Sequence, residues 1–440
     1  MGNSNGKRLF ADEVTIADLL SHRSGLAGGV GFNLAFQGDS EMLLPADCLF
    51  EIVHHIPHMA PIGERWMYCV WGYSIAGCLI EEVTQKPLHQ YLQEELFDPL
   101  SMSRTTLRLQ IEDTDIAQPY ASLCDSNAYN LEKRQPFQKT FFEASGGVYS
   151  TVNDLLRWSK ATLNAFQEPG ITGGSVLKQI PEILRPQVAV DSVLLPGQYY
   201  SLGWLQTQLP NVVGLIGDNP DLWEIPELPI LGVGSHPRDI IYHQGVTVGY
   251  FSFLALFPET KSAVVVLTNA MAMSDVAEWV ARLLIEALFD FPKRTNYVEL
   301  SREGKRRRIQ QFANMHADLA KEYAPETRLL PVDAYVGQYL NQTYNSILDV
   351  TLDPAKKDDL ILAFQSRPSQ RYGLRHLHGN VFEWALTHDE SKRRGRYTVV
   401  DPSYFKLLFE VDPVGQVCEI VWDLDGFSTP GGVVFSRMNK

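Results

Sequence analysis

Residues 64–83, ERWMYCVWGYSIAGCLIEEV, are the stretch around which the rest of the chain is organised. The preceding Pro61-Ile62-Gly63 segment is typical of a turn, and from Trp71 onward the apolar residues recur at helical spacing. Tyr68 therefore stands where a loop enters a buried helix. We expect the helix to hold its phenol rigidly.

The composition is that of an acidic globular protein. The chain has 440 residues, of which 45% are hydrophobic and 20% charged, and its formal net charge is -14. This length is sufficient for two or more domains with a large core. Non-specific binding to nucleic acid or to an anionic membrane surface needs positive charge, so we expect neither partner. We interpret the local exception, Lys305–Arg308, as a solvated helix face rather than a localisation signal.

The cysteines and the N-terminal residues favour a cytoplasmic protein. Five cysteines are few for this length, odd in number and without metal-ligand spacing, so we expect no disulfide framework. The first residues contain no apolar signal segment, and Gly6 stands where a myristoylation signal has Ser or Thr. No apolar run reaches the roughly 18 residues that span a bilayer.

Residues 1–295 are expected to form an α/β domain. Val14–His22 has helix-spaced apolar residues after a Thr cap, and Gly25 can take the left-handed geometry that ends a helix. Gly249–Phe257 and Ser262–Thr268 predict a β-hairpin, and helices on either side of a hairpin indicate an α/β layer. Residues 166–235 are rich in Pro and Gly, and we expect this segment to include long loops.

A change in composition marks a second domain. Residues 296–325 are charged and helical in pattern, which predicts a connector. Residues 326–440 alternate short strand-like runs with turns, which indicates a small antiparallel β-sandwich or barrel. The expected strands are residues 335–340, 346–352, 360–364, 381–384, 404–410, 417–422 and 433–435.

Three short motifs carry residue types suited to catalysis. Tyr68 precedes the buried helix, His243-Gln244-Gly245 closes a strand-like run, and Gly146-Gly147 indicates a tight turn before another helix. Each motif alone is weak, because a buried Tyr or His is usually structural. Their order along the chain makes them more informative.

Five ordered segments resemble the serine β-lactamase and penicillin-binding-protein-like family, which includes class C β-lactamases, esterases, D-aminopeptidases and fungal acyltransferases. The resemblance covers about residues 10–290, and the C-terminal part is similar to the small β-domain often appended to such hydrolases. It implies a helical subdomain beside an antiparallel sheet with flanking helices. The segments are VTIADLLSHRSGL (14–26), PIGERWMYCVWGYSIAG (61–77), FDPLSMSRTT (97–106), SGGVYSTVNDLLRW (145–158) and HQGVTVGYFS (243–252).

The resemblance implies acyl transfer from a small-molecule ester or amide through an acyl-enzyme. The family uses a Ser-x-x-Lys helix, a Tyr-x-Asn loop and a Lys-Thr-Gly or His-x-Gly strand. Tyr68 would be the base that activates the serine, provided that nearby cations lower its pKa. His243 would polarise the site, Gly245 would admit the acyl group, and the Val246 N–H would donate to the oxyanion. Val70 replaces the Asn that contacts substrate in the family.

Aromatic residues are further candidates for the substrate site. Under the resemblance they would line an apolar cleft for an acyl chain, with core packing as the alternative. Trp204 is the one we assign to substrate binding. The full set is Trp66, Trp71, Tyr199, Tyr200, Trp204 and Tyr250.

The nucleophile is the part of the family pattern that this sequence does not provide. The Ser-x-x-Lys helix would precede Val14 by some tens of residues, but thirteen residues stand there. The string Ser4-Asn5-Gly6-Lys7 has the right residue types, yet Asn-Gly favours a turn over a buried helix. Two hypotheses remain open. The chain is a truncated serine hydrolase or acyltransferase of secondary metabolism, or it is an inactive relative that binds a ligand or partner.

A histidine cluster is the rival to this interpretation. His54 and His58 have the spacing of zinc ligands on one helix face, with His55 between them, but Pro57 interrupts the helix. We therefore expect no metal ion, and no other cofactor motif is evident.

Overall fold

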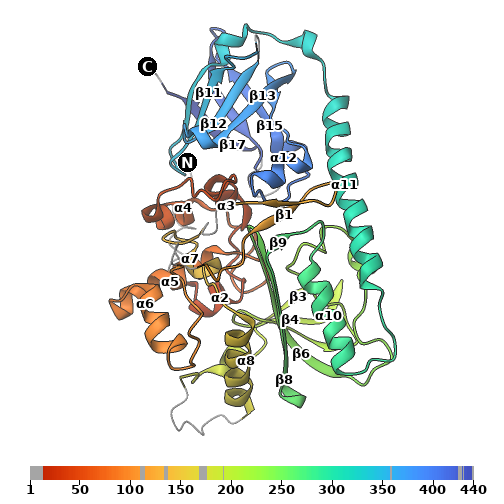
Figure 1. Ribbon diagram of the computed structural model, residues 1–440. Coiled ribbons are helices and arrows are strands. Elements are labelled where there is room, and N and C mark those ends of the chain that lie inside the picture. Colours follow the sequence, from red (N-terminus) through yellow and green to blue (C-terminus); the bar gives the residue numbers. More distant parts are fainter. Residues whose placement is uncertain are drawn as a thin grey trace. The chain divides into compact units, whose positions relative to one another are not determined.

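The computed structural model describes residues 13–109, 114–132, 137–167, 176–191, 193–356, 359–424, 429 and 431–438. The chain forms two compact units (Figure 1). We call Met1–Leu26, Ala60–Ser122 and Ala128–Arg308 the sheet unit. We call Ala27–Met59, Leu123–Asn127 and Ile309–Lys440 the barrel unit. The segments of the two units alternate along the chain, and the domain limits predicted at residues 295 and 325 stay a prediction.

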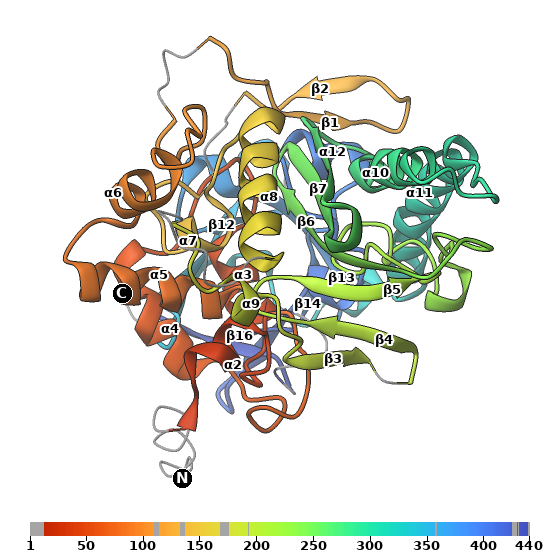
Figure 2. The same ribbon diagram turned by 90° about the horizontal axis from the view of Figure 1, so that it is seen from below.

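The sheet unit is built on an antiparallel sheet whose described strands follow the order β3-β4-β5-β6-β7-β8. Helices α8 and α10 lie on opposite sides of this sheet, as Figure 2 shows. The strands are β1 (Tyr120–Ser122), β2 (Ala128–Asn130), β3 (Val188–Asp191), β4 (Leu195–Tyr200), β5 (Leu205–Leu209), β6 (Arg238–Thr247), β7 (Tyr250–Phe257), β8 (Ser262–Thr268) and β9 (Ala270–Met271). The helices are α2 (Ile16–Leu20), α5 (Trp71–Thr84), α6 (Leu88–Leu92), α7 (Glu143–Gly146), α8 (Val152–Gln167), α9 (Ile180–Ile183), α10 (Val276–Leu288) and the start of α11 (Tyr297–Lys321).

The two faces of β6 point into different cores. Successive side chains of a strand face opposite sides of the sheet. Ile241 packs with Leu163 of α8, in a cluster on one face. Gln244 points the other way, toward Glu278 of α10. His243 therefore shares the α8 side of the sheet with Ile241.

Local capping explains where α2 begins and ends. Thr15 and Asp18 form a reciprocal capping box, in which the Thr15 hydroxyl accepts from the Asp18 N–H and the Asp18 carboxylate accepts from the Thr15 N–H. Gly25 follows the helix with φ +76°, the left-handed geometry that the sequence indicated. Both predictions are confirmed, as is the β7–β8 hairpin, whose seven residue pairs run from Phe251↔Thr268 to Phe257↔Ser262.

The segment expected to include long loops does so after Leu209, but it also contains three strands that the sequence did not reveal. The described part of residues 166–235 includes β3, β4 and β5 together with α9. Pro196 and Gly197 made β4 unrecognisable in the sequence, because both residues are unusual within a strand. Gly197 has φ +75°, and the β3–β4 register shifts between Ala189 and Asp191, so the pair is an irregular edge of the sheet.

The barrel unit settles the choice between sandwich and barrel. The described strands β10 to β17 close into an antiparallel barrel in sequence order. Strand β13 was missed, because the Arg, Gly and His residues of RYGLRHLH hide its alternation. The strands are β10 (Gly337–Asn341), β11 (Ser346–Leu352), β12 (Leu360–Phe364), β13 (Arg371–His378), β14 (Val381–Glu383), β15 (Lys406–Val411), β16 (Val417–Trp422) and β17 (Val433–Arg437), with helices α3 (Gly29–Ala35), α4 (Leu49–His55) and α12 (His388–Arg393).

The basic run Lys305–Arg308 lies within α11, and it is only partly a solvated face. Arg306 pairs with Glu303 at 2.8 Å on the exposed side of the helix. The Arg308 side chain is instead 2% exposed and lies 3.7 Å from the Asp218 carboxylate. The interpretation as a solvated face is therefore wrong for Arg308. No helix in the described ranges combines the length and the apolar character needed to cross a membrane.

Two glycines with positive φ give a matched test of the turn after α2. A Cβ on Gly25 would lie 2.1 Å from the Ala60 carbonyl oxygen, whereas Gly63, with φ +84°, has no atom within 4 Å of that position. Gly63→Ala should lower the free energy of unfolding by about 1–2 kcal/mol from backbone strain alone. Gly25→Ala should cost a further ~1–3 kcal/mol from the clash. Urea denaturation measures both, and equal losses would contradict the close approach.

Candidate functional site

Tyr68 lies in the loop that leads into α5, and the backbone around it is anchored. The Val70 carbonyl accepts from the Ser74 N–H at 3.2 Å, as the first turn of α5 requires. On the other side, the Met67 N–H donates to the His22 carbonyl at 2.7 Å. Val70 stands at the N-cap of the helix. These bonds fix the short segment that carries the phenol.

The imidazole of His22 packs against this phenol. His22 follows α2 in a left-handed conformation, with φ +57°, and is 1% exposed. Its ring centroid lies 4.4 Å from that of Tyr68. Trp66 adds a ring 6.3 Å from Tyr68. No sequence pattern singled out His22, which reads only as the last residue of a predicted helix.

A hydrogen-bonded chain joins His22 to the predicted His243 through Tyr200. The Tyr200 hydroxyl lies 3.1 Å from Nε2 of His22 and 3.0 Å from Nε2 of His243. Tyr200 ends β4 and is fully buried. Tyr200 therefore lies between the Tyr68 loop and strand β6, the two segments that the family resemblance assigned to one site. The predicted pair Tyr68 and His243 is connected through two intervening residues, His22 and Tyr200.

The donors and acceptors in this series of hydrogen bonds can be assigned by starting from His243. Nδ1 of His243 lies 2.6 Å from the Gln244 carbonyl, which only accepts, so Nδ1 carries the proton and Nε2 accepts from Tyr200. The Tyr200 oxygen must then accept from Nε2 of His22. Nδ1 of His22 lies 3.1 Å from both the N–H and the C=O of Cys69, and this direction selects the Cys69 N–H as its donor.

Burial keeps these groups uncharged. Desolvation lowers the pKa of His22 to about 3, with a further contribution from His243, and lowers the pKa of His243 to about 4. The Tyr68 side chain is 44% exposed, yet the protein packed around it raises the pKa of its hydroxyl to about 12. Both imidazoles are therefore neutral near pH 7. Neither can act as the cation that would turn Tyr68 into a base.

The strand side of the site is formed by the end of β6. Strand β5 pairs with β6 only as far as Tyr242, so within the described residues 243–247 are paired on the β7 side alone. Gly245 stands opposite Ser252, and a Cβ there would lie 2.5 Å from the Ser252 hydroxyl oxygen. A larger residue at this position would require the Ser252 hydroxyl to turn away. Val246 pairs with Phe251, and the oxyanion role of its N–H stays a prediction.

A buried carboxyl pair supports β6 from behind. The Gln244 amide donates to Asp275 at 3.0 Å and to Glu278 at 3.4 Å, and its oxygen accepts from the Ile216 N–H. Desolvation raises the pKa of Asp275 to about 7 and that of Glu278 to about 8. The sequence did not reveal this network, because its members are 31 and 34 residues away from Gln244.

The aromatic candidates divide between site and core. The ring centroid of Trp66 lies 5.9 Å from that of Tyr200, so Trp66 belongs to the site. Trp204 is 6% exposed and stacks on Trp158 in the core beneath α8, with ring centroids 5.4 Å apart. Its predicted contact with substrate gains no support from this packing. Trp71 is likewise buried, against Phe142.

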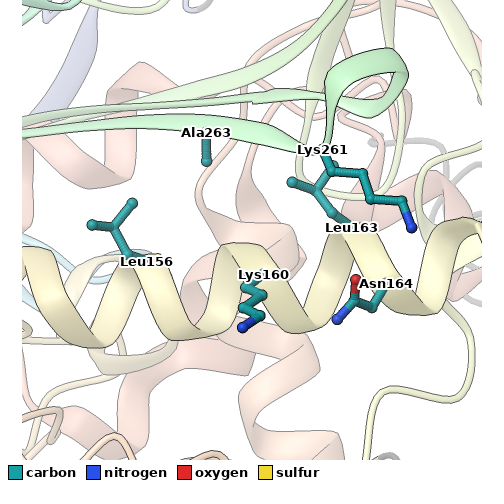
Figure 3. A pocket seen from close by; sticks show the side chains of 6 residues that line it. All are labelled: Leu156, Lys160, Leu163, Asn164, Lys261 and Ala263. Carbon is teal, nitrogen blue, oxygen red and sulfur yellow. The ribbon is translucent and has the colours of Figure 1, made fainter.

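Two other features lie apart from these residues. Figure 3 shows a pocket of about 290 Å³ lined by Leu156, Lys160, Leu163 and Asn164 of α8 and by Lys261 and Ala263 at the start of β8. None of these residues belongs to the chain of Tyr68, His22, Tyr200 and His243. Within the described residues, His54, His55 and His58 do not converge as metal ligands would. The Ser4–Lys7 string lies outside the described residues.

Known proteins resemble the chain over both units. The Beta-lactamase family model matches residues 7–287, and the model of a domain of unknown function (DUF3471) matches residues 321–430. Unguisins hydrolase ungD' of Aspergillus campestris is 25% identical, over 76% of this chain and 58% of its own length. Unguisins hydrolase ungD of Aspergillus violaceofuscus is 22% identical, over 78% and 59%. The chain thus spans about three fifths of the length of these relatives.

Among solved structures, the octameric penicillin-binding protein homologue from Pyrococcus abyssi aligns with a TM-score of 0.47 and 17% identity, over 96% of this chain and 77% of its own. The family match confirms the expected fold, an α/β domain with an antiparallel sheet and flanking helices, followed by an all-β domain.

Removing the Tyr200 hydroxyl should show how much its hydrogen bonds to His22 and His243 stabilise the sheet unit. Tyr200→Phe deprives the buried His22 of its acceptor and the partly buried His243 of its donor. We expect the free energy of unfolding to fall by about 1–3 kcal/mol. Tyr199→Phe is the matched control, because the neighbouring side chain is 43% exposed. Its effect should stay within about 0.5 kcal/mol. Equal losses of unfolding free energy for the two variants in urea denaturation would contradict a stabilising role for the Tyr200 hydrogen bonds.

The carboxyl pair behind β6 should make stability depend on pH. A carboxyl whose pKa rises on folding stabilises the fold fully below its unfolded pKa, and this contribution is lost as pH rises through the folded pKa. For Glu278 the window runs from its ordinary value of 4.5 to about 8. Stability should fall across it, and Glu278→Gln should flatten the slope. The slope is the readout, because the variant also loses the contact of Glu278 with Arg282 at every pH. Glu82→Gln, an exposed control on α5, should keep the wild-type slope of the urea midpoint against pH.

Proposed function

Because the chain belongs to the β-lactamase family of hydrolases, we propose that it forms the base side and the strand side of an acyl-transfer site for a small-molecule ester or amide. The observation that carries this proposal is the buried chain His22–Tyr200–His243, which ties the Tyr68 loop to the end of β6. Such a connection holds a phenol and a strand edge in a fixed relation, as acyl transfer demands.

In the proposed reaction, Tyr68 moves the proton. A phenolate at Tyr68 takes the proton of a serine hydroxyl as the serine oxygen bonds to the acyl carbon. The Val246 N–H stabilises the oxyanion. When the bond from the acyl carbon to the leaving oxygen or nitrogen breaks, Tyr68 returns the proton to that atom. Water or another hydroxyl then releases the acyl group, so hydrolysis and acyl transfer share this scheme.

The proposed reaction needs a cation beside Tyr68. A phenol whose pKa is about 12 is protonated near pH 7, and His22 and His243 are neutral there. A lysine next to the hydroxyl would lower its pKa by favouring the phenolate. The two imidazoles are positioning residues in this scheme. They hold the phenol and the strand without adding charge.

We place the nucleophile outside the described residues. Among those residues, Tyr68 contacts the rings of His22 and Trp66, and no serine hydroxyl is hydrogen-bonded to it. A serine with a lysine one helical turn later would meet both needs, as the Ser-x-x-Lys pattern does. Two relatives are named unguisins hydrolases, so unguisins are the first compounds to assay, and a role in secondary metabolism is part of the proposal.

The second candidate is an inactive relative that binds a ligand in the same place. The raised pKa of Tyr68 favours it, because a protonated phenol donates a hydrogen bond but cannot act as a base. Binding of an intact ester or amide without turnover, in every form of the protein, would support this alternative.

The 440-residue chain gives the first test. We expect no stoichiometric labelling by a fluorophosphonate and no hydrolysis of p-nitrophenyl esters or unguisins above background. Peptide mapping by mass spectrometry locates any label. A stoichiometric label on a serine of the described residues would overturn the placement of the nucleophile outside them.

A longer form that carries the Ser-x-x-Lys segment gives the second test. There Tyr68→Phe should lower kcat by about 100-fold or more, since the general base is lost. Tyr199→Phe, whose side chain is 43% exposed, should leave kcat unchanged. An unaltered kcat in Tyr68→Phe would remove Tyr68 from the reaction.

A further inference from the structure

Three side chains of the barrel unit converge although they come from distant parts of the sequence. Cys124 belongs to the Leu123–Asn127 segment, and His388 and Asp389 begin α12. Their sulfur, nitrogen and oxygen ligand atoms all lie within 4.8 Å of one another. We propose that Cys124, His388 and Asp389 bind a zinc ion.

The distances match the edges of a zinc tetrahedron. Zinc bonds of ~2.3 Å to sulfur and ~2.0–2.2 Å to nitrogen and oxygen place sulfur about 3.6 Å from nitrogen, and nitrogen about 3.4 Å from oxygen. Sγ of Cys124 lies 3.5 Å from Nδ1 of His388. Nδ1 lies 2.9 Å from Oδ1 of Asp389. The first edge already has its final length, and the second has to open by about half an ångström.

Both elements that present the ligands are locally fixed. Thr387 and Glu390 form a capping box at the start of α12, with the Thr387 hydroxyl accepting from the Glu390 N–H at 3.3 Å. The Cys124 turn is closed by the Leu123 N–H, which donates to the Asn127 carbonyl at 3.0 Å. Ligands held before the metal arrives lose less conformational entropy when it binds.

Burial and charge also suit a zinc ion. The His388 side chain is 3% exposed, with the Phe312 ring 5.2 Å away, whereas the Asp389 side chain is 35% exposed. The site is therefore closed on the histidine side and open at the carboxylate, which leaves a path for the ion and a fourth position for water. A thiolate and a carboxylate neutralise the two charges of Zn²⁺. Thiolate with imidazole favours zinc over magnesium or calcium.

Without metal, protons hold the same groups together. Oδ1 of Asp389 accepts from the Cys124 N–H at 2.8 Å and from Nδ1 of His388 at 2.9 Å. Zinc takes the place of the proton on Nδ1 and of the thiol proton, because thiolate and unprotonated nitrogen are the ligands. The thiol proton is released, and the ring keeps its one proton on Nε2. Zinc affinity should therefore rise with pH.

The experiment counts zinc on the full chain. The protein is stripped with a chelator, dialysed against Zn²⁺ near pH 7.5 and passed over a desalting column, and the metal is measured by inductively coupled plasma mass spectrometry. We expect one zinc per chain. Cys124→Ser and Asp389→Asn should each weaken binding by at least about 100-fold, since even residues that only orient ligands change affinity by ~10–100-fold. Cys418→Ser and His378→Gln, in the same unit, should bind zinc like the wild type.

A second measurement does not depend on how the variants fold. In the unchanged chain, Zn²⁺ should slow the alkylation of Cys124 by iodoacetamide at least about tenfold, while Cys418 is unaffected. Co²⁺ in place of zinc should give a thiolate-to-metal absorption band in the near ultraviolet. Zinc that is not retained, or that neither protects Cys124 nor is lost from Cys124→Ser, would overturn the proposal and leave a hydrogen-bonded cluster only.

Discussion

The interaction on which the candidate site depends is the hydrogen-bonded chain His22–Tyr200–His243. His22 follows α2, Tyr200 ends β4 and His243 lies in β6. His22 and Tyr200 are buried and His243 is partly buried, and a buried polar group without its partner costs about 1–3 kcal/mol. Each segment is therefore positioned by the other two. The relation between the Tyr68 loop and the β6 edge follows from that mutual requirement.

The same burial limits the acid–base chemistry that these hydrogen-bonded residues can perform. Desolvation holds both imidazoles neutral and raises the pKa of the phenol, so these residues provide geometry and no charge. A base at Tyr68 requires a cation from outside the described residues, and the proposed serine nucleophile requires the same source. Behind β6, Gln244 faces Asp275 and Glu278, and this second buried network fixes the strand from the opposite face.

In the barrel unit, residues far apart in the sequence also come together, and there they form a proposed metal site. Cys124 and His388 are 264 residues apart, and their side chains meet because a turn and a helix of one unit lie together. Spacing rules for metal sites work when ligands share a helix or a hairpin. The histidines near residue 55 have the spacing of metal ligands but do not converge. Two of the proposed zinc ligands, Cys124 and His388, are too far apart in the sequence for a spacing rule to connect them.

The sequence by itself determined the elements that local chemistry specifies: the Thr15 cap, the helix after Tyr68, the β7–β8 hairpin and most barrel strands. Period, caps and turn residues act over a few positions, so they can be read in order. Only the tertiary structure decided that Trp204 is core, that β3 to β5 extend the sheet, and that His22 and Tyr200 join Tyr68 to His243. His22 and Tyr200 are 178 residues apart, and no local pattern records a contact made by packing.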